Sequence, residues 1–365
     1  MTTTAAHTVA SVLLAVLCAG SVSARTIDTV VVTNKHDAGP GSLRAALSRG
    51  DRTVRFAADV DGDIVLTRDI RVRGSFVTLD GTPGPQGKGI TLRSFGIRVR
   101  GSDGAHDVTI RNIRIRDAVE DGIQVAAGAY NVDIDHVSVS GCHDGNVDVT
   151  QAGTRAIVIR SSILGGRPDK GRNMLLGNQA TGIRLLGNIV IDAPQRNPEL
   201  SFDQTAAARR DAGTTLDMRS NVVWRWGRGR GTRIEEGSTA NVIDNYFGGP
   251  PGTDLADALI VCTGPATARA CSNRPTNVAR AYTSGNVLHG SAIDLDARGT
   301  EAKPFPAPAT ATLGACAAAA RAVEDAGAQP RDAIDAAYAA AIAACGEQPR
   351  RTSADQGPAA PASSR

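Results

Sequence analysis

Four aspartates lie close together in the middle of the sequence and could bind a cation. Asp133 and Asp135 occupy one short segment, and Asp144 and Asp148 follow it. Asp144 and Asp148 are four residues apart on an expected strand, so their side chains point to the same face. Carboxylates that converge from neighbouring strands suit calcium, which takes oxygen ligands in irregular geometry. We therefore expect Asp135, Asp144 and Asp148 to bind Ca2+; the alternative is that they are solvated residues on the outer face of strands.

A second set of charged side chains is basic and follows the aspartates along the chain. Its members are Lys170, Arg172, Arg196, Arg209 and Arg210. A metal site beside basic side chains is what a polyanionic ligand rich in carboxylates requires. The alternative is a scattered basic surface. Arginines at 225, 228, 230 and 233, together with Trp224 and Trp226, are interpreted as a sugar-binding rim, and exposed turns are the alternative there.

The segments that carry these residues repeat along the chain. The repeat aligns Ile110, Ile134, Ile159, Leu185, Met218 and Val242, at steps of 24, 25, 26, 33 and 24 residues. Each unit alternates apolar and polar residues and then turns at Gly, Asn or Asp. Units of this length are shorter than a propeller blade and indicate a β-solenoid, in which coils stack to bury their apolar faces. We expect an all-β, right-handed parallel β-helix, with a β-sandwich as the alternative.

The 33-residue step predicts a loop that leaves the solenoid. Stacked coils have similar circumference, so the excess residues, which fall within 193–213, must lie outside the core. This loop carries Arg196, Arg209 and Arg210. Loops on a rigid scaffold are where binding and catalysis concentrate.

The two ends of the chain differ from the repeat. Residues 1–24 read as a secretory signal, with an apolar run at 9–19 and small residues before position 25. Residues 25–303 should form the β-helix, with a short cap helix within 39–47. Residues 304–347 should form a linker and a helical hairpin broken at Gly327 and Pro330, and residues 348–365 a disordered tail. We therefore expect a protein secreted to the extracellular space or the periplasm.

Composition limits the partners of the protein. The chain has 40 basic and 37 acidic residues and 3% aromatic residues, which argues against nucleic-acid binding. The apolar run near the N-terminus is too short to span a bilayer, so we expect no membrane partner, and we expect a monomer. In an oxidising compartment Cys262 would pair with Cys271 and Cys316 with Cys345, which leaves Cys142 as a small buried side chain.

Several short motifs occur in a recognisable order. They are Ile64-Val-Leu-Thr67, Val77-Thr-Leu-Asp-Gly81, Asn131-Val-Asp-Ile-Asp-His136, Asp144-Gly-Asn-Val-Asp148, Asn173-Met-Leu-Leu-Gly177, Gln195-Arg-Asn-Pro198 and Gly327-Ala-Gln-Pro-Arg-Asp-Ala-Ile-Asp335. As a set, over roughly residues 64–249 and the last motif, the sequence resembles the pectate lyases of polysaccharide lyase family one.

This resemblance implies a function and assigns roles to residues. The family cleaves polygalacturonate by calcium-assisted β-elimination, which gives 4,5-unsaturated oligogalacturonides. Asp135, Asp144 and Asp148 would hold calcium, and Arg196 would be the catalytic base.

The substrate-binding residues follow from the same resemblance. The family's substrate-binding lysine falls at Arg172, with Lys170 beside it. Its second arginine falls at Ser201, so Arg209 or Arg210 would have to supply that charge from the longer loop. Two alternatives stay open: a non-catalytic β-helix that binds acidic polysaccharide, and a glycoside hydrolase on the same scaffold.

Overall fold

The sequence repeat corresponds to the coils of a parallel β-helix. The computed structural model describes residues 25–166, 171–201, 213–263, 271 and 278–346. In it, the six aligned residues are direct partners in successive parallel strands, from Ile110 and Ile134 through to Met218 and Val242. The register predicted from sequence is therefore confirmed, and each step measures one coil.

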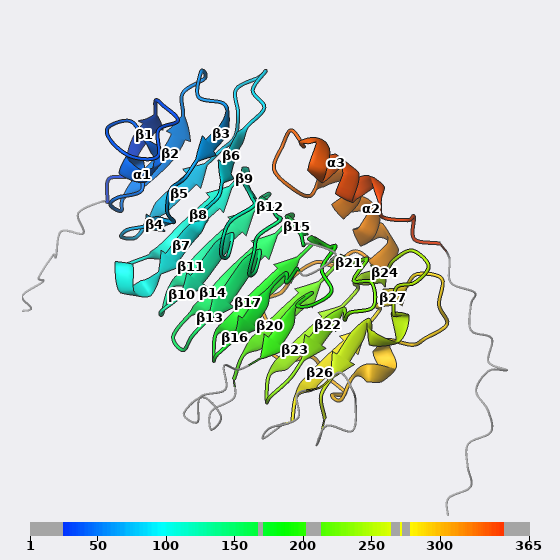
Figure 1. Ribbon diagram of the computed structural model, residues 1–365. Helices are drawn as coiled ribbons and strands as arrows, with labels where there is room; N and C mark the ends of the chain where they lie inside the picture. The colour runs from blue at the N-terminus through cyan, green and yellow to red at the C-terminus, as the bar shows by residue number, and fades with distance from the viewer. Residues whose placement is uncertain (1–24, 167–170, 202–212, 264–270, 272–277, 347–365) are drawn as a thin grey trace, which may run out of the picture.

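Three parallel sheets run along the solenoid, and each coil passes through all three (Figure 1). The ten-strand sheet contains β1 (Asp28–Val32), β2 (Arg52–Phe56), β5 (Val77–Asp80), β8 (His106–Arg111), β11 (Tyr130–Asp135), β14 (Arg155–Arg160), β17 (Thr181–Leu186), β20 (Thr215–Arg219), β23 (Thr239–Ile243) and β26 (Arg280–Ser284). The nine-strand sheet contains β3 (Gly62–Val65), β6 (Ile90–Arg93), β9 (Ile113–Arg116), β12 (Ser138–Ser140), β15 (Ile163–Gly165), β18 (Ile189–Ile191), β21 (Val222–Trp224), β24 (Tyr246–Gly248) and β27 (Val287–Leu288).

The third sheet has eight strands and carries the chemistry discussed below. Its strands are β4 (Ile70–Val72), β7 (Ile97–Arg100), β10 (Ile123–Ala126), β13 (Val147–Thr150), β16 (Leu175–Gly177), β19 (Glu199–Ser201), β22 (Thr232–Ile234) and β25 (Leu259–Val261). Short 3-10 helices occur at Gly101–Asp103, Leu255–Asp257 and Asp296–Arg298.

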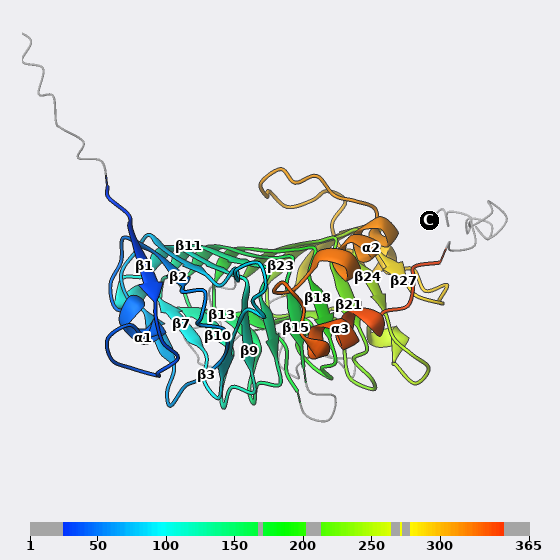
Figure 2. The same cartoon turned by 90° about the horizontal axis from the view of Figure 1, so that it is seen from above.

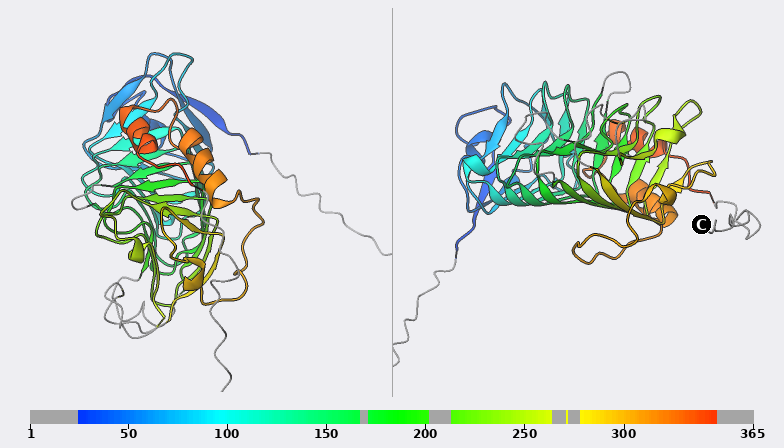
Figure 3. Two further views of the ribbon diagram at one scale, coloured as in Figure 1. Left: turned by 90° about the vertical axis from the view of Figure 1, so that its right-hand side faces the viewer. Right: turned by 90° about the horizontal axis from the view of Figure 1, so that it is seen from below.

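Alternation along each strand fills the interior of the solenoid. On β11, Val132 and Ile134 are buried inside while Asp133 and Asp135 point outward. The inward residues of all three sheets form one continuous apolar cluster, because each coil covers the exposed face of the next. Figure 2 shows the coils stacked along a rod, and the left view of Figure 3 looks toward one end of it. The apolar cluster fills the space inside the coils.

The corner between the ten-strand and nine-strand sheets shares one backbone feature in seven coils. One residue with positive φ, between 45° and 70°, stands at each turn: Asn112, His136, Ser161, Gly187, Ser220, Asp244 and Gly285. Just inside this corner, four asparagines form a hydrogen-bonded ladder: Asn188, Asn221, Asn245 and Asn286. Each ladder side chain also donates to a main-chain carbonyl of the preceding coil. The ladder thereby satisfies polar backbone groups that the turn would leave unpaired.

Helices cover the first coil and part of the nine-strand sheet. α1 (Leu43–Ala46) caps the N-terminal end, and Ser42 accepts a hydrogen bond from the Ala45 N–H at its start. α2 (Ala315–Asp325) packs over β21 and β24, and α3 (Ala333–Ala340) lies over β9 and β15, where Tyr338 meets Gly165 and Asp335 pairs with Arg116 (Figures 1 and 2). The cap helix and the C-terminal helices expected from sequence are therefore present.

Two disulfides join the cysteines as expected, Cys262 with Cys271 and Cys316 with Cys345, and Cys142 is free and buried. Within the described part of the chain, no helix is both long enough and apolar enough to cross a bilayer. The expected signal (residues 1–24) and the whole of the expected C-terminal tail (residues 348–365) lie outside the described residues.

Candidate active site

Asp148 is fixed on the outer face of the eight-strand sheet. It lies on β13 between Val147 and Val149, which point into the core, so the strand turns Asp148 outward. Its Oδ1 accepts a hydrogen bond from the Leu175 N–H of the next coil at 2.9 Å, and the residue is only 6% exposed. Asp144 stands in the turn before the same strand, and its side chain is 46% exposed. The predicted pair thus consists of one buried and one accessible carboxylate.

Asp121 is the third carboxylate at this place. It precedes β10, one coil earlier, and its Oδ1 accepts a hydrogen bond from the Gly145 N–H at 3.0 Å. A Cβ added to Gly145 would lie 2.5 Å from Oδ1 of Asp148 and 3.1 Å from Oδ1 of Asp121. Both carboxylates therefore flank the bare backbone of Gly145, where any side chain would fill the space between them.

The three carboxylates repel one another in a poorly solvated place. Burial, reinforced by the charge of Asp121, raises the pKa of Asp148 to about 8. Burial also raises the pKa of Asp121, and the charge of Asp144 acts in the same direction. A bound cation would relieve this repulsion. Among the described residues, however, no three acidic, histidine or cysteine side chains already surround one point. Binding would require the exposed Asp144 to turn toward Asp121 and Asp148.

Two arginines approach these carboxylates from the next two coils. Nη1 of Arg172 lies 2.7 Å from Oδ1 of Asp144. Nη1 of Arg196 lies 3.7 Å from the same oxygen and 4.0 Å from Oδ2 of Asp148. Arg172 is 47% exposed and Arg196 19% exposed, so Arg172 can reorient while Arg196 is confined.

The turn that carries Arg196 is held by the main chain and by Asn197. Arg196 has a positive φ of 63°, and its carbonyl accepts a hydrogen bond from Met174 N–H at 2.7 Å. Asn197 is buried, and its Nδ2 donates to the carbonyls of Ala193 at 2.7 Å and Arg230 at 2.9 Å. These bonds hold the backbone of the turn from which the Arg196 side chain reaches toward Asp148.

Four of the residues predicted from sequence come together here: Asp144, Asp148, Arg172 and Arg196. Asp135 does not. It lies on β11 in the ten-strand sheet, where Oδ1 contacts Nδ1 of His136 at 2.6 Å and Oδ2 contacts Nη2 of Arg160 at 2.9 Å. Of the three aspartates expected to bind calcium, the structure thus places Asp135 away from Asp144 and Asp148, and Asp121 lies beside Asp148 instead. The chain turns a corner between β10 and β11, so Asp135 faces away despite its proximity in sequence.

A periodicity in the sequence places acidic residues one coil before Asp144. Glu120-Asp121 lies 24 residues before Asp144-Gly145, which is one coil of the repeat, and Ile123 pairs with Val147. This step aligns Glu120 with Asp144 and Asp121 with Gly145, so the repeat indicates an acidic pair beside the site without selecting Asp121. Lys170, Arg209 and Arg210 lie outside the described residues and stay predictions. Ser201 ends β19 beside Gly177, where it brings no positive charge.

The expected sugar-binding rim is wrong. Trp224 and Trp226 are 2% and 1% exposed, so neither indole can stack on a sugar. Trp226 donates from Nε1 to the Asp254 carbonyl at 2.8 Å, and Trp224 packs against Tyr246 under the C-terminal helices. Both side chains belong to cores of the molecule.

Curated relatives of this chain are named probable pectate lyases. It is 34% identical over 242 residues to a probable pectate lyase C of Emericella nidulans, which covers 65% of this chain and 52% of that protein. It is 33% identical over 245 residues to a probable pectate lyase C of Aspergillus terreus. That match covers 65% of this chain and 54% of that protein. The chain thus spans about half the length of the curated relatives it matches. No protein-family model matches the chain.

Solved pectate lyases share the fold. A pectate lyase from Bacillus sp. N165 in complex with trigalacturonate superposes with a TM-score of 0.59 at 18% identity, over 82% of this chain and 93% of that one. Pectate lyase C from Erwinia chrysanthemi, solved with Ca2+, superposes with a TM-score of 0.50 at 14% identity. The superposition covers 85% of this chain and 94% of that one. The chain is thus similar in sequence to proteins named probable pectate lyase C, and it has the parallel β-helix fold of solved pectate lyases.

Proposed function

We propose that this protein is a polysaccharide lyase that cleaves polygalacturonate by calcium-assisted β-elimination. The observation that carries the proposal is the guanidinium of Arg196, confined within 4.0 Å of Asp148 and beside Arg172 on the outer face of the eight-strand sheet. The fold neighbours that contain trigalacturonate and Ca2+ support the substrate and the cation. Asp121, Asp144 and Asp148 are the side chains that would hold calcium.

The chemistry follows from the charges around Arg196. Calcium at the three aspartates would neutralise the C6 carboxylate of a galacturonate and thereby make the C5 proton more acidic. Arg172 is exposed enough to leave Asp144 and bind the same carboxylate. Arg196 would accept the C5 proton, while the C5–H electrons form the C4–C5 double bond and the C4–oxygen bond breaks. The leaving oxygen takes a proton from solvent.

Arginine is an unusual base because its free pKa exceeds 12. Arg196 can act only in its neutral form, so we expect the rate to rise toward alkaline pH. Wild-type protein with calcium should produce the ultraviolet absorbance of unsaturated uronides from polygalacturonate, and a chelator should abolish it. Absence of that absorbance at alkaline pH would contradict the proposal.

The role of Arg196 has a direct test. Arg196→Ala should lower the rate by about 10²–10⁴-fold, the usual contribution of a general base. Arg49→Ala is a matched control, because Arg49 is 72% exposed at the N-terminal end and far along the chain from the site. An equal loss of rate in Arg196→Ala and Arg49→Ala would mean that Arg196 has no catalytic role.

A glycoside hydrolase is the second candidate, and the buried Asp148 favours it. A carboxyl whose pKa is raised to about 8 stays protonated at neutral pH, as a general acid must. A hydrolase would release new reducing ends without ultraviolet absorbance and would not need calcium. Binding of polygalacturonate without any chain shortening would instead select a non-catalytic binding protein, which the serine at position 201 favours.

We also propose that the protein is secreted and acts as a monomer. The signal-like sequence at residues 1–24 supports export. N-terminal sequencing of protein from the medium or the periplasm should begin at Arg25, and sedimentation of that material should give the mass of one chain.

A further inference from the structure

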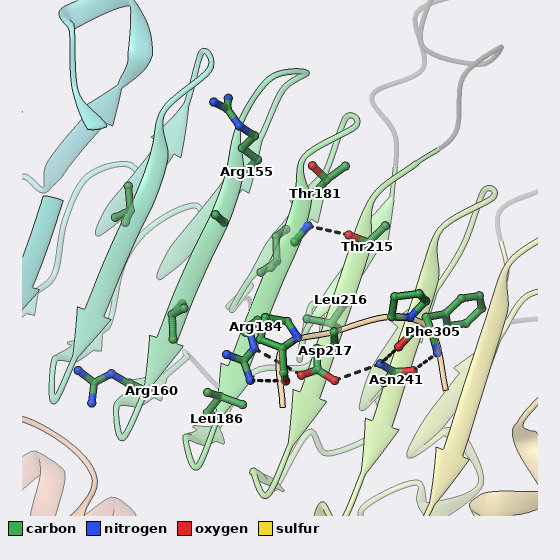
Figure 4. Close-up of a pocket in the computed structure, with 18 of the residues that line it drawn as sticks. Arg155, Arg160, Thr181, Arg184, Leu186, Thr215, Leu216, Asp217, Asn241 and Phe305 are labelled. Atoms are coloured by element: carbon green, nitrogen blue, oxygen red, sulfur yellow. Dashed lines mark hydrogen bonds and ion pairs between the residues drawn. The ribbon is translucent and has the colours of Figure 1, made fainter. Parts of the chain in front are cut away.

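A groove crosses the outer face of the ten-strand sheet, on a different sheet from Arg196. It encloses about 810 Å³ and extends over strands β11, β14, β17, β20 and β23 (Figure 4). Neighbouring strands lie about 4.8 Å apart, so five of them span about 19 Å. The groove is therefore long enough for several units of an extended polymer.

Small outward residues create the hollow. Ala156, Val158 and Gly182 line it, and longer side chains at these positions would fill it. Arg155 and Thr181 stand along one side and Arg160 and Leu186 along the other (Figure 4). The floor is thus apolar, and both sides carry polar groups.

One end of the groove already holds an extended segment of this chain. The N–H of Phe305 donates to Oδ1 of Asn241 at 2.8 Å, and Nδ2 of Asn241 donates to the Phe305 carbonyl at 3.1 Å. Arg184 bonds to Thr310 and to the Pro308 carbonyl at the far end of the segment. The segment 305–308 forms a strap over the groove, and its contacts show that the sheet face accepts an extended chain.

The other end of the groove carries a cation without an acidic partner. The Arg155 guanidinium lies 4.3 Å from the centre of the Tyr130 ring and donates to the Gly153 carbonyl at 3.1 Å. No carboxylate in the described part of the chain forms an ion pair with Arg155, whereas Arg160 is paired with Asp133 and Asp135. Arg155 is exposed, so a carboxylate from another molecule can reach it.

Hydroxyl groups repeat beside this cation. Thr181, Thr215 and Thr239 line the groove on successive strands. Hydroxyls spaced one strand apart, an apolar floor and an unpaired arginine match a sugar polymer that presents hydroxyls, C–H faces and carboxylates.

We propose that this groove binds a stretch of acidic polysaccharide, separately from the site at Arg196. The choice of an acidic glycan rests on the proposed function, while the groove and its free arginine do not. A second attachment point on another face of the rod would keep the polymer near the protein after each release, because a tethered ligand rebinds at high effective concentration.

Calorimetric titration with a short oligogalacturonate tests this binding site. The titrated protein should carry Arg196→Ala and Asp148→Asn and be kept in chelator, which removes the site on the eight-strand sheet. On that background, Val158→Phe should block the groove, and Arg155→Ala should weaken binding about tenfold or more through loss of a charge-assisted hydrogen bond. Arg49→Ala serves as the control, and melting curves confirm that each variant is folded.

Each outcome decides the proposal. Binding that survives the block of the eight-strand sheet and is lost in Val158→Phe and weakened in Arg155→Ala supports it. No binding on that background, or binding unchanged in both groove variants, overturns it. Equal binding of a neutral glucan of the same length overturns the acidic class. If the wild type produces no unsaturated uronides but the groove variants still lose binding, only the lyase proposal fails.

Discussion

At the scale of single residues, the site depends on which carboxylates share a face. Asp121 and Asp148 flank Gly145 on the eight-strand sheet, while Asp135 is tied to His136 and Arg160 on another sheet. A cation can be shared only by side chains that reach one point. Substitution of each aspartate in turn therefore distinguishes the two ligand sets.

Asp121→Asn should weaken calcium binding by tenfold or more, because it removes one negative ligand at the cation. Asp135→Asn should leave calcium affinity unchanged, although it loses ion pairs. Titration of each purified variant with calcium measures this. A strong effect of Asp135 with none of Asp121 would restore the ligand set predicted from sequence.

The sequence predicts four of the residues that the structure brings together, but not Asp121. Asp144, Asp148, Arg172 and Arg196 are identifiable because their motifs keep their order and spacing. Asp135 lies close to Asp144 in sequence, but the corner after β10 puts it on another sheet. The sugar-binding rim predicted at Trp224 and Trp226 fails for two reasons. A helix more than ninety residues further along the chain covers Trp224, and Trp226 is buried with its Nε1 donating to the Asp254 carbonyl. Such long-range cover leaves no local pattern.

At the scale of elements, buried ion pairs attach the C-terminal helices to the solenoid. Asp335 on α3 is fully buried, and its Oδ1 lies 2.7 Å from Nη2 of Arg116 on β9. Arg114 is buried beside it, with its Nε 3.7 Å from the same carboxylate. Two guanidiniums in the protein interior depend on this carboxylate and on the partly exposed Asp332.

Asp335→Ala should lower the free energy of unfolding by about 3–5 kcal/mol, because it leaves buried positive charge without its carboxylate partner. Arg321→Ala breaks an exposed pair with Asp325 on α2 and should cost less than about 1 kcal/mol. Denaturant titrations compare the two. Similar losses would mean that the helix is attached by its apolar contacts instead.

His136 makes the contact between the solenoid and α2 sensitive to pH. A hydrogen bond to Asp135 raises the pKa of His136. Burial acts in the opposite direction, and the charges of Asp135 and Asp325 raise the pKa further. Because the folded pKa is raised, the protonated imidazole stabilises the fold fully below the unfolded value of about 6.5. That contribution is lost as pH rises through the folded pKa.

We therefore expect the denaturation midpoint to fall as pH rises above about 6.5. His136→Gln should flatten that part of the profile and leave the midpoint at higher pH little changed. Melting curves across this range provide the measurement, and a wild-type profile that the substitution does not alter would exclude His136 as the cause.

At the scale of the whole molecule, the repeat of the sequence is the repeat of the structure. The register was predictable because inward residues must stack, so Ile110, Ile134 and Ile159 could be aligned without coordinates. The positions of the strap and the C-terminal helices could not, since composition predicts a helix or a linker but not the face that it covers.

Asn221→Ala tests how far one ladder position supports the rod. The side chain is buried and hydrogen-bonds to Asn188 and Asn245 and to the carbonyls of Leu185 and Arg219. Its removal leaves buried polar groups unpaired on both neighbouring coils. We therefore expect the free energy of unfolding to fall by about 1–3 kcal/mol for each group left unpaired. Urea denaturation gives the value, and an unchanged midpoint would mean that water replaces the ladder.

The left-handed residue at each corner between the ten-strand and nine-strand sheets makes the coils interchangeable units. A junction cut at Ser161 meets the same positive φ, within about 10°, as one cut at Asn112 or Asp244. A complete unit can therefore be copied or excised with matching ends, whereas an insert of any other length must bulge out of the rod. Because the candidate site draws its side chains from the four successive coils of β10, β13, β16 and β19, the units that could be added or removed without touching it are those outside these four coils.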